Sequence, residues 1–280
     1  MEQHKKNGSR RVVVKVGTST LTHESGNLNL RSFDRLARVL ADLHGQEHEI
    51  ILVSSGAISI GTAKLGLAER PSQLRMKQAA AAVGQCRMMH IYDKFFSEYN
   101  RSVAQILLTG DDVDEPDRAA HLRATFSALL EMGVIPIVNE NDSVSSAEIE
   151  TGHHKVLGDN DTLSAIVAAL CQADLLILMS DIDGLYDADP HLHPEAQLLH
   201  RVEALTPEIR QMAGGAGTRH GTGGMMTKLS AARIAMEAGC DMVITNGSRP
   251  EDIYAIVEGR DIGTRFVAQR PDGEGQAGTR

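Results

Sequence analysis

Short runs of β-branched and other apolar residues recur along the chain, and longer segments with helical periodicity separate them. The runs lie at 12–16, 49–55, 103–109, 134–139, 174–180 and 242–246. They are apolar at nearly every position, which is typical of parallel strands covered on both faces. We therefore expect six buried strands, most of them parallel.

The segments between these runs predict helices at 30–44, 71–100, 116–132, 161–172, 225–238 and 250–258. Strands that alternate with helices indicate an α/β fold, in which a doubly wound, mainly parallel sheet is sandwiched by helices. Ligands bind such sheets at the carboxyl ends of the strands. The residues just after each strand are therefore the candidates for chemistry.

The pattern also divides the chain into regions. We expect a basic N-terminal extension over 1–10, a single domain over 11–268 and a flexible, Gly-rich tail over 269–280. Two long irregular stretches, 145–161 and 213–225, interrupt the domain. Loops of this length inside a domain usually bind something or are disordered.

Composition narrows the class of protein. The chain has 28 Lys and Arg against 37 Asp and Glu, a net charge of −9, and only nine Phe and Tyr with no Trp. Nucleic-acid binding is disfavoured, because it uses clustered cations and aromatic rings. No stretch approaches the roughly 20 apolar residues of a membrane span, and no signal peptide is apparent. We expect a cytoplasmic protein without nucleic-acid or membrane partners.

The metal-ligating residue types are scattered. Cys86, Cys171 and Cys240 lie far apart in the sequence, which argues against a disulfide framework or a zinc cluster. The pair His153-His154 lacks a third ligand at a recognisable spacing. We expect no metal held by the protein's own side chains.

Two strand ends carry small residues suited to an anion. The first strand runs into Lys15-Val16-Gly17-Thr18-Ser19, where Gly17 would let backbone amides approach a phosphate and Lys15 would supply a positive charge. The second ends in Ser54-Ser55-Gly56-Ala57, ahead of a helical pattern whose amides would face an anion. Either motif alone is also explained by a solvated Lys or a Ser-capped turn, and no Walker A or Gly-x-Gly-x-x-Gly pattern follows.

Two acidic clusters flank the first irregular stretch. Asn139-Glu140-Asn141-Asp142 ends the fourth strand, and Gly158-Asp159-Asn160-Asp161 precedes the next helix. Such residues hold an ammonium group, bind Mg²⁺ through water or orient lysines. A purely structural interpretation makes Asp161 the helix cap and the others turn residues.

Two more motifs follow. The fifth strand ends in Ser180-Asp181 and leads into a turn at Gly184 and Asp189-Pro190. Later, Gly221-Thr222-Gly223-Gly224-Met225-Met226-Thr227-Lys228 opens a helix, so backbone amides, the helix dipole and a cation converge. Two lysines, Gly-rich anion loops and carboxylates suit phosphoryl transfer, in which catalysis is mostly positioning and cationic stabilisation.

The motifs KVGTSTL, VSSGAI, KQAAAAVGQ, NEND, GDND, DGLYDADP and GTGGMMTK, in this order over residues 10–268, resemble the amino-acid kinase family. The closest likeness is to members that act on glutamate. The resemblance implies transfer of the γ-phosphate of ATP, with Mg²⁺, to the side-chain carboxylate of L-glutamate. The product would be glutamyl 5-phosphate, in the first step of proline biosynthesis.

The resemblance also implies roles for individual residues. Lys15 and Lys228 would stabilise the transferred group, Asp161 would hold both lysines, and Gly17 and Gly56 would supply amides. The implied substrate-binding residues are Ser55, Gly56, Asp142, Asp159 and Asn160. The implied nucleotide-binding residues are Lys15, Gly17, Ser180, Asp181, Thr222, Gly223, Gly224, Met225 and Lys228.

Three departures from the family pattern stand out. Several residues are inserted around Thr151 to Leu157, beside the expected substrate pocket. Ser180 stands where many relatives have Thr. Many relatives also carry a small C-terminal PUA domain, and we expect none here because the chain ends at Arg280. The family also implies a homo-oligomer, dimer or tetramer, and feedback inhibition by L-proline.

Two other functions fit the same motifs. One is a related carboxylate kinase acting on N-acetylglutamate or aspartate, and the other is a non-catalytic sensor of nucleotide or amino acid. Acidic residues such as Asp142 and Asp159 favour a free ammonium over an acetamide. A sensor would have little need for two cations at the transferred phosphate, so we favour the glutamate-phosphorylating enzyme.

Overall fold

The computed structural model describes residues 8–23, 26–144, 159–190, 192–213 and 224–269. Within these residues, eight strands form one sheet in the order β3-β4-β2-β1-β5-β7-β8-β6. The strands are β1 (Arg11–Val16), β2 (Glu49–Ser54), β3 (Val103–Leu108), β4 (Ile135–Glu140), β5 (Leu175–Ser180), β6 (Arg201–Val202), β7 (Asp241–Asn246) and β8 (Thr264–Phe266). Only the pairing of β7 with β8 is antiparallel. All six expected strands are present, and the expected α/β class is confirmed.

The helices of the described residues fall between these strands. They are α1 (Thr18–Leu21), α2 (Leu30–Gly45), α3 (Ala57–Lys64), α4 (Leu74–Glu98), α5 (Gly110–Asp114), α6 (Pro116–Glu131), α7 (Asn160–Leu170), α8 (Pro207–Ala213), α9 (Met225–Glu237) and α10 (Asp252–Val257). All six expected helices are found. The elements outside the predicted ranges are short: β6 has two residues, β8 three, α1 four, α5 five, α8 seven and α3 eight. Of these, only α3 was anticipated, as the helical pattern that follows Ser54-Ser55-Gly56-Ala57. Segments of this length cannot display a period.

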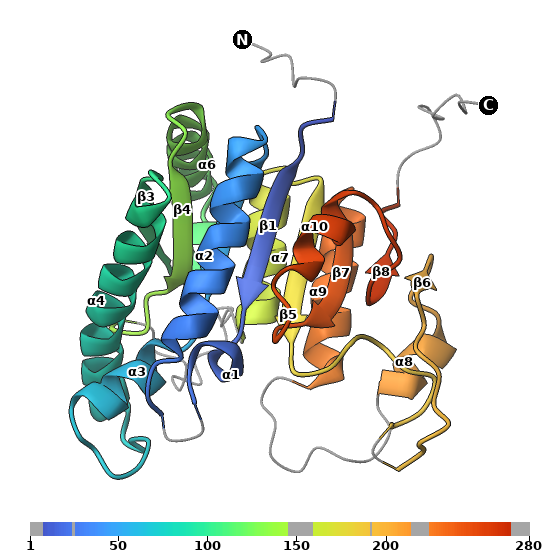
Figure 1. Ribbon diagram of the computed structural model, residues 1–280, viewed down its shortest axis with the longest axis horizontal. Coiled ribbons are helices and arrows are strands. Elements are labelled where there is room, and N and C mark those ends of the chain that lie inside the picture. Colours follow the sequence, from blue (N-terminus) through green and yellow to red (C-terminus); the bar gives the residue numbers. More distant parts are fainter. Residues whose placement is uncertain (1–7, 24–25, 145–158, 191, 214–223, 270–280) are drawn as a thin grey trace.

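The two faces of the sheet bury separate apolar cores. Because side chains alternate along a strand, Val12 and Val14 face the core built with α2, α4 and α10, whereas Val13 faces the core built with α6, α7 and α9. Figure 1 shows α2 and α10 on the near side of the sheet and α7 and α9 on the far side. This double cover explains why the strands are apolar on both faces.

The strands that follow β1 in the sequence are added first on one side of β1 and then on the other. The chain passes from β1 to β2 on one side, and after β4 it returns to place β5 on the other side. The connections therefore diverge at the carboxyl end of β1, which opens a crevice there. Figure 1 shows α1 and α3 beside this edge of the sheet.

Helix α3 is held against α4 by two glycines. A Cβ added at Gly61 would lie 1.8 Å from the Ala80 carbonyl oxygen, and one at Gly84 would lie 1.8 Å from that of Ala57. The two backbones are thus in direct contact, and a methyl group has no room at either position. This contact fixes α3, whose first residues border the crevice.

We predict that Gly84→Ala lowers the free energy of unfolding by about 3 kcal/mol, because backbone must shift to admit the methyl group. The midpoint of thermal unfolding should fall by roughly 6 °C or more. Gly45→Ala is the matched control, since its Cβ would meet only the flexible end of Arg101. Equal midpoints for the two variants would contradict the close helix contact.

Candidate active site

A cleft of about 670 Å³ opens at the carboxyl ends of β1, β2, β4 and β5. Its walls come from the turns after these strands and from the beginnings of α1, α3 and α7. The expected site residues that line it are Lys15, Gly17, Ser55, Gly56, Asp142, Asp159, Asn160, Asp161, Ser180, Asp181 and Lys228. Segments distant in sequence are thus brought to one cavity.

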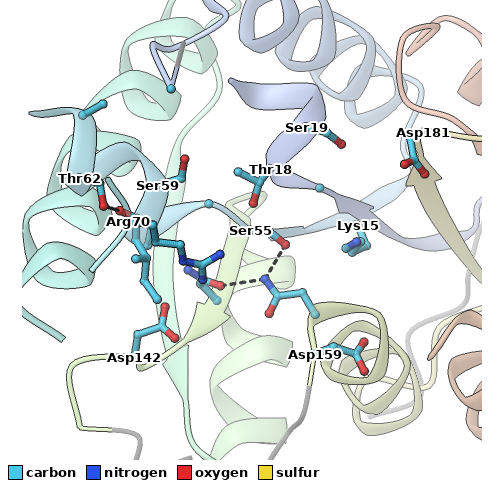
Figure 2. A pocket seen from close by; sticks show the side chains of 18 of the residues that line it. Lys15, Thr18, Ser19, Ser55, Ser59, Thr62, Arg70, Asp142, Asp159 and Asp181 are labelled. Carbon is cyan, nitrogen blue, oxygen red and sulfur yellow. Dashed lines mark hydrogen bonds between the residues drawn. The ribbon is translucent and has the colours of Figure 1, made fainter. Parts of the chain in front are cut away.

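The order of the strands sets the order of the side chains along the cleft. Asp142 follows β4, Ser55 follows β2, Lys15 lies on β1 and Asp181 follows β5, and these strands are consecutive neighbours in the sheet. Figure 2 shows the same sequence, with Asp142 at one end, Ser55 and Lys15 between, and Asp181 at the other end. The cleft therefore has two chemically distinct ends separated by a cationic centre.

That cationic centre is organised by Asp161. The Asp161 carboxylate binds Lys15 Nζ through Oδ1 at 2.7 Å and Lys228 Nζ through Oδ2 at 3.1 Å. Thr227 Oγ1 also donates to Oδ2, at 3.1 Å. Only 3% of Asp161 and 7% of Lys228 is exposed. We call these three residues, Lys15, Asp161 and Lys228, the lysine centre.

Asp161 remains ionised despite its burial. Burial is the largest single influence and raises its pKa, but the charges of Lys15 and Lys228 and their hydrogen bonds together lower the pKa below its ordinary value. The carboxylate thus stays negative at neutral pH. It can hold two ammonium groups that would otherwise repel each other.

Helix α7 owes its starting point to Asp159. Asp159 Oδ1 accepts hydrogen bonds from the backbone amides of Asp161 and Thr162, at 2.8 and 2.9 Å. The alternative that made Asp161 the helix cap is therefore wrong, because Asp159 occupies that position. The cap leaves the Asp161 carboxylate available to the lysines.

The two glycines expected to serve an anion occupy different conformations. Gly17 has an extended backbone, and a Cβ there would lie 3.8 Å from Lys15 Nζ, in the space that an anion bound to that lysine needs. Gly56 has φ +103°, which side-chain-bearing residues rarely adopt. Gly56 is the N-cap of α3 and has no side chain to accept a hydrogen bond from the first amides of this helix. These amides therefore lie at the cleft without a side-chain cap.

The end of the cleft near Asp142 is polar and partly buried. Asn160 Nδ2 donates to Ser55 Oγ at 2.6 Å and to Asn139 Oδ1 at 3.3 Å. Burial and the nearby Glu140 carboxylate raise the pKa of Asp142 to about 6, although the Arg70 guanidinium opposes this. Figure 2 shows Arg70 beside Asp142. One corner of the cleft thus offers a carboxylate and a cation together.

The end beyond Lys15 carries the expected nucleotide segments. Ser180 is buried and donates from Oγ to Asp181 Oδ1 at 3.0 Å. Gly224 and Met225 begin α9 but do not line the cleft as the structure describes it. Thr222, Gly223, the inserted residues around 151–157 and the pair His153-His154 lie outside the described residues.

Among the lining residues that sequence reasoning missed, four have polar or charged side chains: Ser59, Thr62, Glu69 and Arg70. Ser59 and Thr62 lie one turn apart on α3, so the start of that helix at the Ser55-Gly56 turn was a usable signal. Arg70 lies in an irregular segment between α3 and α4, away from any strand end. No periodicity or strand-end rule could have located it.

No group of three or more His, Cys, Asp or Glu side chains is placed to hold a metal ion in the part of the chain that the structure describes. No helix among those residues is long and apolar enough to cross a membrane.

Comparison with known proteins relates this site to a family. The family model described as "Amino acid kinase family" matches residues 10–246. A glutamate 5-kinase of Clostridium perfringens is 53% identical over 262 residues, covering 94% of this chain and 97% of that protein. A glutamate 5-kinase of Listeria monocytogenes is 51% identical over 264 residues, covering 94% of this chain and 95% of that protein.

A solved structure shares the fold at much lower identity. Carbamate kinase from Giardia lamblia bound to AMP-PNP superposes with a TM-score of 0.64 at 14% identity, over 93% of this chain and 99% of that one. The family resemblance read from the sequence motifs is confirmed by these comparisons. The chain belongs to the amino acid kinase family.

Proposed function

We propose that this chain transfers the γ-phosphoryl group of ATP to the side-chain carboxylate of L-glutamate. The products are L-glutamyl 5-phosphate and ADP, and the reaction is the first step of proline biosynthesis. The lysine centre, set between the Asp142 end and the Asp181 end of one cleft, is the observation that carries the proposal. The expected glutamate kinase agrees with the names of both bacterial relatives, each at least 51% identical to this chain.

The order of the strands supports a separate end of the cleft for each substrate. ATP lies toward Ser180 and Asp181, with its phosphates reaching Lys15, Gly17 and Lys228. Glutamate lies toward Ser55, Asp142 and Asn160, so its side-chain carboxylate points to the lysine centre. The γ-phosphorus is then between donor and acceptor, as in-line transfer requires.

The proposed reaction requires little proton transfer by groups of the protein. A glutamate side chain has a pKa of about 4.3 and is already ionised at pH 7, so no general base is required. One carboxylate oxygen attacks the γ-phosphorus, a new P–O bond forms, and the bond to the β-phosphate oxygen breaks. The electron pair of that bond leaves with ADP.

The lysine centre stabilises the charge that spreads over the transferred group. Lys15 and Lys228 are both shielded from water, with side-chain exposures of 12% and 8%, so their charges act strongly on a nearby phosphoryl group. Asp161 holds both ammonium groups before ATP arrives, which limits the reorganisation that the reaction requires. Asp159 acts indirectly by fixing the start of α7.

Recognition of glutamate depends on charges at the other end. Asp142 and Asn160 supply oxygen atoms for the α-ammonium group, and the Arg70 guanidinium faces the α-carboxylate. An acetylated amino group carries no charge, so it gains nothing from Asp142. This arrangement favours free glutamate over N-acetylglutamate.

The cleft would receive Mg²⁺ together with ATP. The Asp161 carboxylate is already committed to two lysines, so the donor set suits a metal ion carried mainly by the phosphates. Asp181 lines the nucleotide end of the cleft and would help to hold the ion. The ion would neutralise phosphate charge beside the lysine centre.

The remaining expectations stay proposals. We assign residues 11–268 to a single domain, which the inclusion of all eight described strands in one sheet supports. We also propose a cytoplasmic homo-oligomer, dimer or tetramer, that L-proline inhibits. Light scattering on the purified protein and activity assays with added L-proline test the last two points.

The acceptor is identified by trapping the acyl phosphate with hydroxylamine in the presence of ATP and Mg²⁺. We expect product from L-glutamate, and a value of kcat/KM about 10- to 100-fold lower for N-acetylglutamate because its amino group is uncharged. L-Aspartate serves as a shorter acceptor with the same ammonium group. Faster turnover of the acetylated acceptor would overturn the assignment, and absence of product from all three would favour a sensor.

Removal of one ammonium group tests the lysine centre. We predict that Lys228→Met lowers kcat by about 100- to 1,000-fold, because half of the charge stabilisation is lost while the volume is nearly kept. Lys64→Met, at the exposed end of α3, is the matched control and should keep the wild-type kcat. If both variants turn over at the same rate, Lys228 does not act on the transferred group.

The raised pKa of Asp142 predicts a pH effect on glutamate recognition. Only ionised Asp142 attracts the α-ammonium, so kcat/KM for glutamate should fall about tenfold per pH unit below pH 6, the pKa of Asp142 in the free protein. In Asp142→Asn this inflection should vanish and the value at pH 8 should be at least about tenfold lower. The KM for ATP should show no matching change, and an unaltered inflection in the variant would assign it to another group.

A further inference from the structure

A buried glutamine behind the cleft is linked to the acceptor end by hydrogen bonds. Gln85 lies on α4, a helix that lines no part of the cleft, and only 8% of the residue is exposed. Its Oε1 accepts a hydrogen bond of 3.0 Å from Asn139 Nδ2. Asn139 in turn contacts Asn160, which contacts Ser55. We call this series, Gln85-Asn139-Asn160-Ser55, the amide chain.

The amide chain has a direction. A carboxamide has one donor end and one acceptor end, so an Asn139 that donates to Gln85 must turn Oδ1 toward Asn160. Asn160 therefore points its own donor, Nδ2, at Asn139 Oδ1 and Ser55 Oγ. The orientation of Gln85 is passed through two amides to the surface of the cleft.

The direction decides what the cleft presents to a ligand. With Nδ2 of Asn160 engaged twice, its acceptor Oδ1 remains for a ligand, and Ser55 keeps its hydroxyl proton for donation. In the opposite direction Asn160 would offer an N–H group, which repels an ammonium. The observed direction matches the free α-ammonium that Asp142 also attracts.

Charges behind the cleft account for the orientation of Gln85. Gln85, Glu140 and Asp142 line a second cavity of about 370 Å³ that meets the cleft at Ala57 and Asp142. The carboxylates of Glu140 and Asp142 attract the positive NH₂ end of the Gln85 amide toward the second cavity. Gln85 Oε1 then points to Asn139 and accepts its hydrogen bond. Gln85 Nε2 is buried and has no hydrogen-bond partner among the described residues. None of those residues therefore holds the Gln85 amide in the reversed orientation.

We propose that Gln85 is a positioning residue that fixes the direction of the amide chain and thereby selects acceptor substrates with a free ammonium group. It touches neither substrate and acts through Asn139 and Asn160. The inference rests on the proposed glutamate kinase activity and adds a determinant of its specificity outside the cleft.

Two substitutions at Gln85 separate direction from mere packing. Gln85→Glu keeps an acceptor for Asn139 and removes the donor, whereas Gln85→Met keeps the approximate volume and removes both. At pH 8, where Asp142 is ionised, we expect Gln85→Met to raise the KM for L-glutamate about tenfold or more and to reduce the preference over N-acetylglutamate similarly. Its kcat and its KM for ATP should stay within about threefold, and Gln85→Glu should keep the wild-type preference.

Gln46→Met is the matched control, because Gln46 is exposed at the C-terminal end of α2 and lines neither cavity, and it should leave all constants unchanged. Thermal unfolding shows whether each variant is folded, and Gln85→Leu replaces Gln85→Met if the latter is not. Wild-type constants in the apolar variant, equal defects in Gln85→Glu and Gln85→Met, or a joint rise of both KM values would each overturn the inference. A wild-type protein that forms no glutamyl phosphate would overturn the proposed function and this inference with it.

Discussion

The contact of one buried carboxylate with two ammonium groups joins the parts of this molecule on which its chemistry depends. Lys15 belongs to the central strand, Asp161 to the first turn of α7 and Lys228 to the first turns of α9. Removing water from two like charges costs several kcal/mol, and the Asp161 carboxylate offsets that cost. The position of each element is thus tied to the others by charge as well as by apolar packing.

The order of the strands in the sheet determines the order of the site residues along the cleft. Neighbouring parallel strands lie about 4.8 Å apart, so residues after β4, β2, β1 and β5 are spaced at regular intervals along the cleft. A zwitterion, a transferred phosphoryl group and a nucleotide can lie in line over these strands. Because β1 is central, its lysine stands where the two substrates would meet in the proposed reaction.

The sequence was informative wherever a rule links local pattern to position. Continuous apolar runs predicted β1 to β5 and β7, because a strand covered on both faces has little choice of residue. Strand-end motifs, with the family resemblance, identified Lys15, Asp161 and Lys228. Their mutual contact follows from the order of the strands and the crossing of α7 and α9, which no local pattern encodes.

Other features depend on tertiary structure alone. Arg70 reaches the cleft from an irregular segment, and β8 is too short to show alternation. Gln85 closes the run KQAAAAVGQ, one of the motifs that carry the family resemblance, yet the run itself contains nothing that orients an amide. Its orientation is set by Asn139 and by carboxylates that are more than 50 residues away in the chain.

The separation of the two ends of the cleft also bears on how such enzymes diverge. In the proposed function, residues after β2 and β4 would meet the acceptor and residues after β5 would meet the nucleotide, so substitutions at one end would leave the other intact. A lineage can therefore acquire a new acceptor by a few changes in two loops while it inherits its phosphate-handling apparatus whole. Carbamate kinase from Giardia lamblia shares this fold at 14% identity, so the sheet and its crevice tolerate extensive change of sequence.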